Sequence, residues 1–239
     1  MSIKELEECF ISDTSIYFKE VIRNDLYYEL EVLDNDNIKK IIFDKDCDFN
    51  NVIESKFLPN NLTHLYLNSK FNSEIELIPS LTHLYFGFRF NTEINLLKIN
   101  CLTHLSLGFS FNKNLILPNT LLYLELGCNN QYIIDNIPNS IKTLKLINHF
   151  NLELNNLPNS IESIIFITDH ENYCYNRRWN KIYNYEKELN NLPNSVKYLY
   201  LPCDYKFLIK RFPKNLIKIY CNRNYKYLIY LEDYEIEFI

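Results

Sequence analysis

The sequence predicts a repeat solenoid of short parallel strands, with about 20 residues in each turn. A six-residue frame with apolar residues at its first, fourth and sixth positions returns along the chain, as in LTHLYL at Leu62 and LTHLYF at Leu81. Seven of the eight prolines stand just before a copy of this frame, and all three glycines stand six residues after the start of a copy. Because these rare residues share the register of the frame, the repeat is real.

The frame occurs nine times between residues 38 and 221. Its copies start 24, 19, 21, 19, 20, 20, 35 and 20 residues apart, at Ile38, Leu62, Leu81, Leu102, Leu121, Ile141, Ile161, Val196 and Leu216. Alternating apolar and polar residues at the end of the frame predict a strand with one buried face. Strands that recur in one direction pair in parallel, and each copy needs its neighbours to cover its apolar face.

The remaining positions of the repeat are predicted to return the chain to the next strand. Glycine after the strand predicts a turn with positive φ, and Asn68 holds this place in its copy. Apolar pairs such as Ile94 and Leu97 predict the opposite wall, and proline predicts an extended or polyproline corner. A Phe-Asn pair predicts an inward ring and an amide that bonds backbone groups. Its phenylalanines are Phe71, Phe90, Phe111 and Phe150.

These letters resemble the FNIP repeat, a relative of the leucine-rich repeats. Residues 71–91 (FNSEIELIPSLTHLYFGFRFN) and 150–161 (FNLELNNLPNSI) carry the clearest copies, and the resemblance covers roughly residues 38–221. The order LPxxLxxLxL is also similar to the short bacterial leucine-rich type. The resemblance implies a leucine-rich-repeat-like solenoid with a parallel sheet on its concave face and an extended or irregular convex side. The usual leucine-rich repeat has its asparagine two residues nearer the strand, so the turn after the sheet is expected to differ.

Residues 1–37 and 222–239 are predicted to cap the two ends of the solenoid. Ser2 and Glu5 have capping-box spacing ahead of a short helix that includes Phe10, and Phe18 opens the apolar face of a second helix. The C-terminal YLIYLEDYEIEFI alternates apolar and acidic residues, which predicts a closing strand. Some FNIP proteins carry an N-terminal F-box, but residues 1–37 lack a convincing F-box opening.

The 35-residue interval before Val196 holds about 15 extra residues near 168–188, which are expected to emerge as a loop. Arg177, Arg178 and Trp179 lie in it, and these residue types often dominate binding energy at interfaces. The alternative is that Trp179 packs back onto the solenoid.

The third and fifth positions of each copy are predicted to point away from the core as an aromatic strip of mixed charge. Such a strip suits protein recognition, because tyrosine supplies contact area at low entropy cost. The candidate partner-binding residues on it are His64, Tyr66, His83, Tyr85, His104, Tyr123, Glu125, Lys145, Tyr198, Tyr200 and Tyr220.

The three histidines raise a zinc enzyme as an alternative, since three imidazoles can hold a catalytic ion. Zinc ligands must converge to ~2.1 Å from the metal, whereas side chains stacked along a sheet run parallel at ~4.8 Å. We therefore expect no metal and no other cofactor. Phosphate-binding glycine loops and nucleophile elbows are also missing from the sequence, which argues against an enzyme.

Composition limits the remaining functional classes and the cellular location. The net charge of −5 argues against a general nucleic-acid binder, although residues 206–226 hold seven basic residues and no carboxylate. No stretch approaches the ~20 apolar residues that span a bilayer. Seven cysteines without a CxxC pair, and an acidic N-terminus without a signal-peptide core, predict an intracellular protein, cytoplasmic or nuclear. The abundance of Asn, Ile, Lys and Tyr is typical of an AT-rich genome.

The sequence thus predicts a non-enzymatic scaffold that binds another protein through the concave sheet face, with no small-molecule substrate. One alternative is a ubiquitin-ligase substrate receptor or adaptor that docks through residues 1–37. Another is nucleic-acid binding by the basic C-terminal end, whose affinity would fall steeply with salt.

Overall fold

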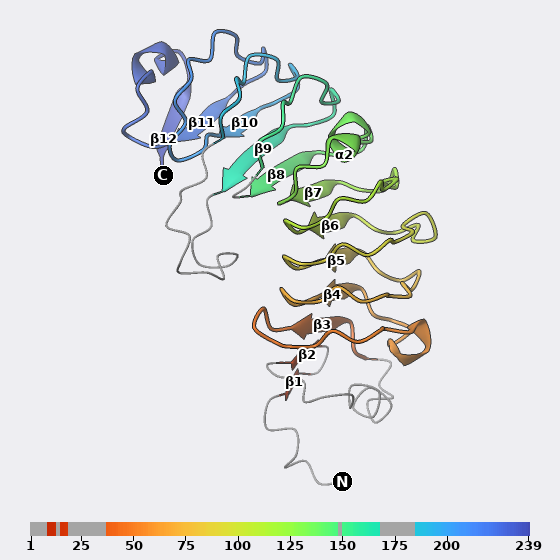
Figure 1. Cartoon of the computed structure of the whole chain (residues 1–239). Coiled ribbons are helices and arrows are strands. Elements are labelled where there is room, and N and C mark those ends of the chain that lie inside the picture. The colour runs from red at the N-terminus through yellow and green to blue at the C-terminus, as the bar shows by residue number, and fades with distance from the viewer. Residues whose placement is uncertain (1–8, 13–14, 19–36, 148–149, 168–184) are drawn as a thin grey trace. The chain divides into compact units, whose positions relative to one another are not determined.

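The computed structural model describes residues 9–12, 15–18, 37–147, 150–167 and 185–239. The chain divides into two compact units, Met1–Lys113 and Asn114–Ile239. In each unit short strands lie side by side along one wall, and irregular segments return along the other (Figure 1). No helix in the described ranges is long and apolar enough to cross a membrane.

The described residues of the first unit form six strands in sequence order. Strand β1 pairs antiparallel with β2, and β2 to β6 pair in parallel. A single 3-10 turn, η2 (Ser55–Phe57), lies in the return segment after β3. The strands are β1 (Cys9–Ser12), β2 (Ser15–Phe18), β3 (Lys40–Phe43), β4 (His64–Tyr66), β5 (His83–Tyr85) and β6 (His104–Leu107).

Six strands are also described in the second unit, and every pair from β7 to β12 is parallel. The short helix α2 (Gln131–Asp135) and the 3-10 turn η3 (Leu228–Leu231) lie outside the sheet. The strands are β7 (Tyr123–Leu126), β8 (Thr143–Ile147), β9 (Ser163–Ile167), β10 (Tyr198–Tyr200), β11 (Lys218–Cys221) and β12 (Glu235–Phe238).

The predicted fold class is confirmed: each of the nine copies of the frame supplies one strand, from β3 to β11. Equivalent positions pair directly, as in the match of His64 with His83 and of His83 with His104. The C-terminal strand is present as β12, which pairs with β11. Sheet pairing also continues before the first copy, through β2 and β1.

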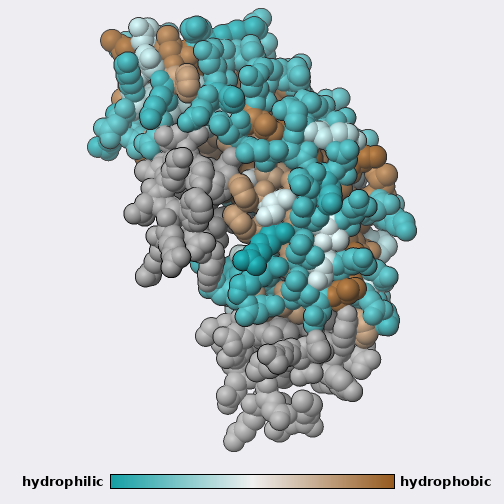
Figure 2. Space-filling model, viewed as in Figure 1, coloured by the Kyte–Doolittle hydropathy of each residue, from teal (hydrophilic) through white to brown (hydrophobic). Residues whose placement is uncertain are grey.

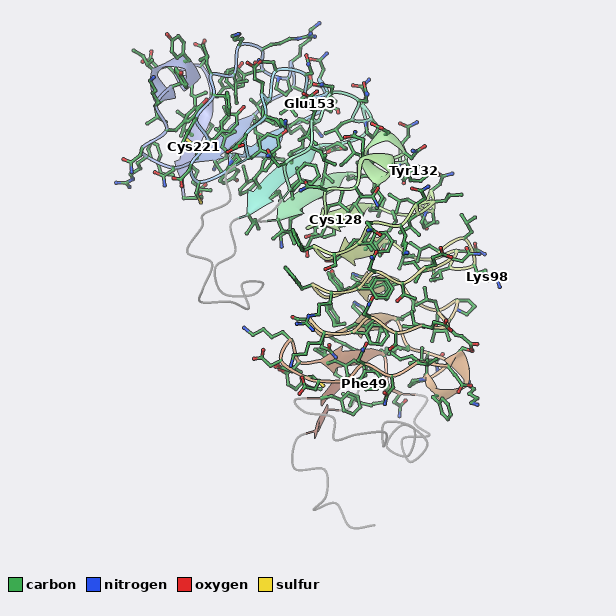
Figure 3. All side chains as sticks on the ribbon, viewed as in Figure 1. Phe49, Lys98, Cys128, Tyr132, Glu153 and Cys221 are labelled. Carbon is green, nitrogen blue, oxygen red and sulfur yellow. The ribbon has the colours of Figure 1, made fainter. Side chains whose placement is uncertain are left out.

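The core of most turns is made by the apolar residues of the frame together with one inward aromatic ring. Leu62, Leu65 and their counterparts in the other copies are buried, and burial of each such side chain contributes roughly 1.5–3 kcal/mol to stability. In the first unit the rings of Phe49, Phe71, Phe90 and Phe111 follow one another at centroid distances of 6.0 Å. Phe49 begins this series inside the first unit (Figure 3), and it belongs to a Phe-Asn pair that the sequence analysis did not count.

The second unit continues the same inward aromatic position with tyrosine in place of phenylalanine. Phe150, Tyr185, Tyr205 and Tyr225 follow one another at 6.0–6.4 Å. Each tyrosine hydroxyl donates to a backbone carbonyl of the preceding turn, at Leu152 (3.0 Å), Lys187 (3.2 Å) and Phe207 (2.7 Å). Burial raises the pKa of all three phenols, to about 12 for Tyr225.

The prediction that glycine provides a positive φ is wrong for Gly87 and Gly108, whose φ angles lie outside the left-handed region. The reason for glycine is space. A Cβ at Gly87 would lie 2.0 Å from the carbonyl oxygen of Asn68, and a Cβ at Gly108 would lie 2.0 Å from that of Gly87. The turns after successive strands therefore pack backbone against backbone, which no side chain permits.

Asparagine amides bond backbone groups, as predicted for the Phe-Asn pairs. The Asn50 side-chain oxygen accepts from the backbone N–H of Asn72 (2.6 Å), and Asn72 accepts in turn from Asn91 (2.7 Å). Asn68, in the glycine place of its copy, is fully buried. Its amide donates to the carbonyl of Phe49 (2.8 Å) and accepts from the N–H of Phe71 (2.8 Å).

One detail of the return segment adds to the prediction and another differs from it. The prolines stand at the start of tight turns: the Pro59 carbonyl accepts from the N–H of Leu62 (3.0 Å), and most later copies repeat this bond. Leu97 is 54% exposed, and the neighbouring Leu96 is buried in its place. The period of the apolar pairs could not distinguish two adjacent leucines.

The N-terminal cap also differs where the structure describes it. Phe10 lies in β1 and Phe18 in β2, so neither belongs to the predicted helices. Ile16 and Phe18 are both buried, which is the alternation of a half-buried strand. The predicted capping box at Ser2 and Glu5 lies outside the described residues.

Candidate functional site

The outward positions of the strands form the candidate surface. Because neighbouring strands pair position for position, the third residue of each frame forms one column and the fifth residue forms a second. In the first unit these columns hold what we call the first-unit face: Lys40, His64, Tyr66, His83, Tyr85 and His104. All six side chains are half-buried, with the core residues of the frame fixing the strands beneath them.

The imidazole column consists of His64, His83 and His104. Its rings stack nearly parallel, with centroids 4.0 Å apart at both steps. Beside each ring lies the threonine that precedes it in the frame. The hydroxyl oxygens of Thr63, Thr82 and Thr103 lie 2.8–2.9 Å from the Nδ1 atoms of the following histidines.

The threonines fix which imidazole nitrogen carries the proton. Each hydroxyl donates its single proton to a carbonyl of the preceding turn, at 3.0 Å for Thr63 and 3.1 Å for Thr82 and Thr103. The imidazole Nδ1 must then donate to the hydroxyl oxygen, and we assign the lone pair of the neutral ring to Nε2. The column therefore presents acceptor nitrogens on the Nε2 side.

The column is held in its neutral form at pH 7. Burial lowers the pKa of all three imidazoles, and the positive charges of neighbouring groups lower it further for two of them. Lys40 and His104 repel a proton on His64. His83, between the other two rings, has its pKa lowered to about 4.

The second column of the first-unit face is aromatic. The Tyr66 and Tyr85 rings stack at 4.4 Å with an interplanar angle of 7°, and burial raises the pKa of Tyr66. The Lys40 ammonium lies 5.0 Å from the centre of the Tyr66 ring, within the range of a cation–π contact. Sequence reasoning did not include Lys40 among the site residues, although it stands at the third position of a copy that the frame identifies.

The second-unit face is the equivalent surface of the second unit: Tyr123, Glu125, Thr143, Lys145, Tyr198, Tyr200, Lys218 and Tyr220. Tyr200 and Tyr220 stack at 3.7 Å and 3°, and the hydrogen bond between them raises the pKa of Tyr200 to about 12. Tyr198 is the most open of these tyrosines, at 38% exposure.

Both lysines of the second-unit face are held in ion pairs. The Glu125 carboxylate, whose side chain is only 4% exposed, lies 2.8 Å from the Lys145 ammonium and accepts from the Tyr123 hydroxyl (3.1 Å). Lys218 lies 2.7 Å from Glu235 and 2.8 Å from Glu237 of β12. Glu125 therefore stands on the predicted strip but is buried, so a partner would contact the residues around it.

The remaining predicted features are distributed as follows. Arg177, Arg178 and Trp179 lie outside the described residues. Of the basic C-terminal residues, Lys218 is held in ion pairs with β12. The exposed ones are Lys206, Lys210, Arg211, Lys214, Arg223 and Lys226.

The part of the chain that the structure describes holds no group of three or more His, Cys, Asp and Glu side chains arranged for a metal ion. In the imidazole column the rings lie face to face, so their nitrogen lone pairs run parallel and do not converge. Most of the surface visible in Figure 2 is hydrophilic, with apolar side chains in small separate patches.

Comparison with known proteins agrees with this geometry. The FNIP repeat family model matches residues 49–89 and 129–169. The crystal structure of CroV588, described as a novel circular LRR protein, matches with a TM-score of 0.58 and 26% sequence identity. The match covers 92% of this chain, which spans only 38% of the length of CroV588. No curated protein matches the chain. The chain therefore contains FNIP repeats, at residues 49–89 and 129–169, within a leucine-rich-repeat-like solenoid fold.

Proposed function

We propose that this chain is a non-enzymatic interaction scaffold, acting inside the cell, that binds another protein through the outward faces of its sheet. The observation that carries the proposal is the stacked tyrosine pair on each face. Tyr66 with Tyr85, and Tyr200 with Tyr220, present ring edges and hydroxyls from neighbouring strands.

Such columns are suited to binding for a physical reason. Their side chains are already ordered by stacking and by the strands beneath them, so little conformational entropy remains to be lost when a partner docks. Tyrosine also combines apolar contact area with a polar tip, which is why it is enriched at interfaces. A solenoid repeats such positions at every rung and so offers an extended surface.

Affinity capture from a native cell lysate, followed by mass spectrometry, tests this proposal. Tyr66→Ser/Tyr85→Ser removes the stacked tyrosine pair of the first unit, and Tyr200→Ser/Tyr220→Ser removes that of the second. The matched control is Leu97→Ser/Ile116→Ser, which replaces two exposed apolar residues of the return segments. We expect a partner that is retained by the wild type and the control and lost with at least one face variant. Equal recovery from all four proteins, each shown to be folded by circular dichroism, would exclude the sheet faces as the binding site.

A further inference from the structure

The outward positions of β3 to β6 carry one lysine, three histidines and no carboxylate. The third position holds Lys40, His64, His83 and His104, and the fifth holds Ile42, Tyr66, Tyr85 and Ser106. Within the described residues no carboxylate lies in ion-pair range of Lys40. Asp44, which follows β3, is engaged by the hydroxyl of Tyr17.

This pattern is the opposite of that on the second-unit face. There, Glu125 faces Lys145, and Lys218 lies between Glu235 and Glu237, so opposite charges are already matched. The first-unit face has one full positive charge and a row of imidazoles that can each gain another. A surface of this kind is electrostatically complementary to a negative partner.

We propose that Lys40, His64 and His83 form a docking site for an extended acidic segment of the partner protein, with carboxylates at alternate residues. This inference deepens the proposed function, since it specifies the chemistry of the partner at the same face. The three residues are in register on β3, β4 and β5. They therefore span two strand spacings, ~9.6 Å, while alternate side chains of an extended chain lie ~6.6 Å apart, so two or three carboxylates cover the row.

Docking of a carboxylate changes the protonation of the imidazoles. The groups on neighbouring strands that face His64 and His83 are Lys40, His104, Tyr66 and Tyr85, and none of them is negative at pH 7. In the free protein Lys40 and the other rings repel a proton, whereas a bound carboxylate attracts one. Binding therefore takes up protons, and the affinity must rise as the pH falls.

Fluorescence anisotropy with a defined probe tests the site. The probe is a fluorescein-labelled peptide of alternating threonine and glutamate, and the control probe has glutamine at each glutamate. The full chain is titrated at low ionic strength, at pH 7.5 and at pH 6.0, where glutamate with its usual pKa of about 4.3 stays ionised. Circular dichroism at both pH values verifies that each protein is folded.

We expect the acidic probe to bind about tenfold more tightly at pH 6.0 than at pH 7.5, and the glutamine probe to bind much more weakly at both. In His64→Gln/His83→Gln the pH dependence should fall to less than about twofold. Lys40→Gln should weaken binding at pH 7.5, where the imidazoles are neutral and the ammonium is the only full positive charge of the site. The matched control, Lys210→Gln/Arg211→Gln at the basic C-terminal end, should bind like the wild type.

Equal affinities for the acidic and glutamine probes, or no change between the two pH values in the wild type, would overturn the proposal. So would loss of binding in Lys210→Gln/Arg211→Gln, because the acidic probe would then occupy the basic end. If the probe fails but the captured partner still requires Tyr66 and Tyr85, the acidic chemistry is wrong and the binding face stands. If the partner is captured equally well by the variants of both faces, the proposed function itself is contradicted.

Discussion

The two units are built on the same frame but differ in what they place on its outward positions. The first unit repeats one residue in register, so that histidine stacks on histidine and tyrosine on tyrosine. The second unit varies these positions and pairs opposite charges across neighbouring strands. The frame determines only the buried side of the strand, and the outward side is open to change. The first-unit face therefore has a lysine without an ion pair to a described carboxylate, whereas the lysines of the second-unit face are already paired.

The inward aromatic position shows the same contrast. Phenylalanine fills it in the first unit through packing alone, whereas Tyr185, Tyr205 and Tyr225 add a hydrogen bond to the preceding turn. Tyr185 follows the residues inserted after β9 and still occupies this position. The extra residues therefore enter between the strand and the aromatic position and leave the repeat intact after them.

The largest expected effect lies in the charge pair of the second unit. Lys145→Met leaves the buried Glu125 carboxylate without its cation and should cost roughly 3–5 kcal/mol of unfolding free energy. Glu125→Leu/Lys145→Met removes both charges and should recover most of that loss. Urea unfolding of the three proteins measures both values. A double variant as unstable as the single one would show that the pair itself, and not the unpaired charge, matters.

In the first unit, the next largest effect is expected at Gly87, where the backbones of two successive turns approach closely. Gly87→Ala places a methyl group 2.0 Å from the Asn68 carbonyl oxygen, and we expect a loss of about 3 kcal/mol, at the upper end for overpacking. Arg89→Ala, an exposed change in the same turn, is the control and should alter the melting temperature little. Wild-type stability in Gly87→Ala would mean that the turns can move apart freely.

Tyr205→Phe converts one second-unit ring to the first-unit type. The Tyr205 hydroxyl accepts from the backbone N–H of Leu189 (3.0 Å) and donates to the carbonyl of Lys187. Without the hydroxyl this buried N–H loses its partner, at a cost of about 1–3 kcal/mol. The exposed Tyr198→Phe is the matched control, and thermal unfolding monitored by circular dichroism compares the two. Equal melting temperatures for Tyr205→Phe and Tyr198→Phe would indicate that the hydrogen bonds of the buried hydroxyl add nothing to stability.

The smallest expected effect is the pH dependence of the first unit. Because the folded pKa of the imidazole column is lowered from about 6.5, the unfolded chain binds more protons below that pH. The contribution of the column is therefore complete above pH 6.5 and is lost as the pH falls toward 4. His64→Gln/His83→Gln/His104→Gln should flatten the fall in melting temperature between pH 7.5 and pH 5. An unchanged slope in the triple variant would place the proton-linked groups elsewhere.

The strands could be predicted from sequence because the frame repeats its apolar residues about every 20 residues. Only parallel pairing of equivalent positions buries all of these residues on one side of the sheet. The sequence showed that the turn after the strand needs a glycine at Gly87 but not why. A close backbone approach and a positive φ both select glycine, so the sequence does not distinguish them. The outward position of Glu125 followed from the frame, whereas its burial depends on Lys145 of the next turn. Phe10 and Phe18 were wrongly expected to lie in helices, because a few apolar residues fit both a helix face and an alternating strand.

Binding of the captured partner to surface variants tests the role of the first-unit face most directly. The affinity of the purified partner would be measured by surface plasmon resonance for the wild type, for Tyr66→Ser/Tyr85→Ser and for Leu97→Ser/Ile116→Ser. We predict a loss of about tenfold or more for the tyrosine variant, as expected for removal of central aromatic contacts, and less than about twofold for the control. The same affinity for all three folded proteins would contradict a binding role for this face.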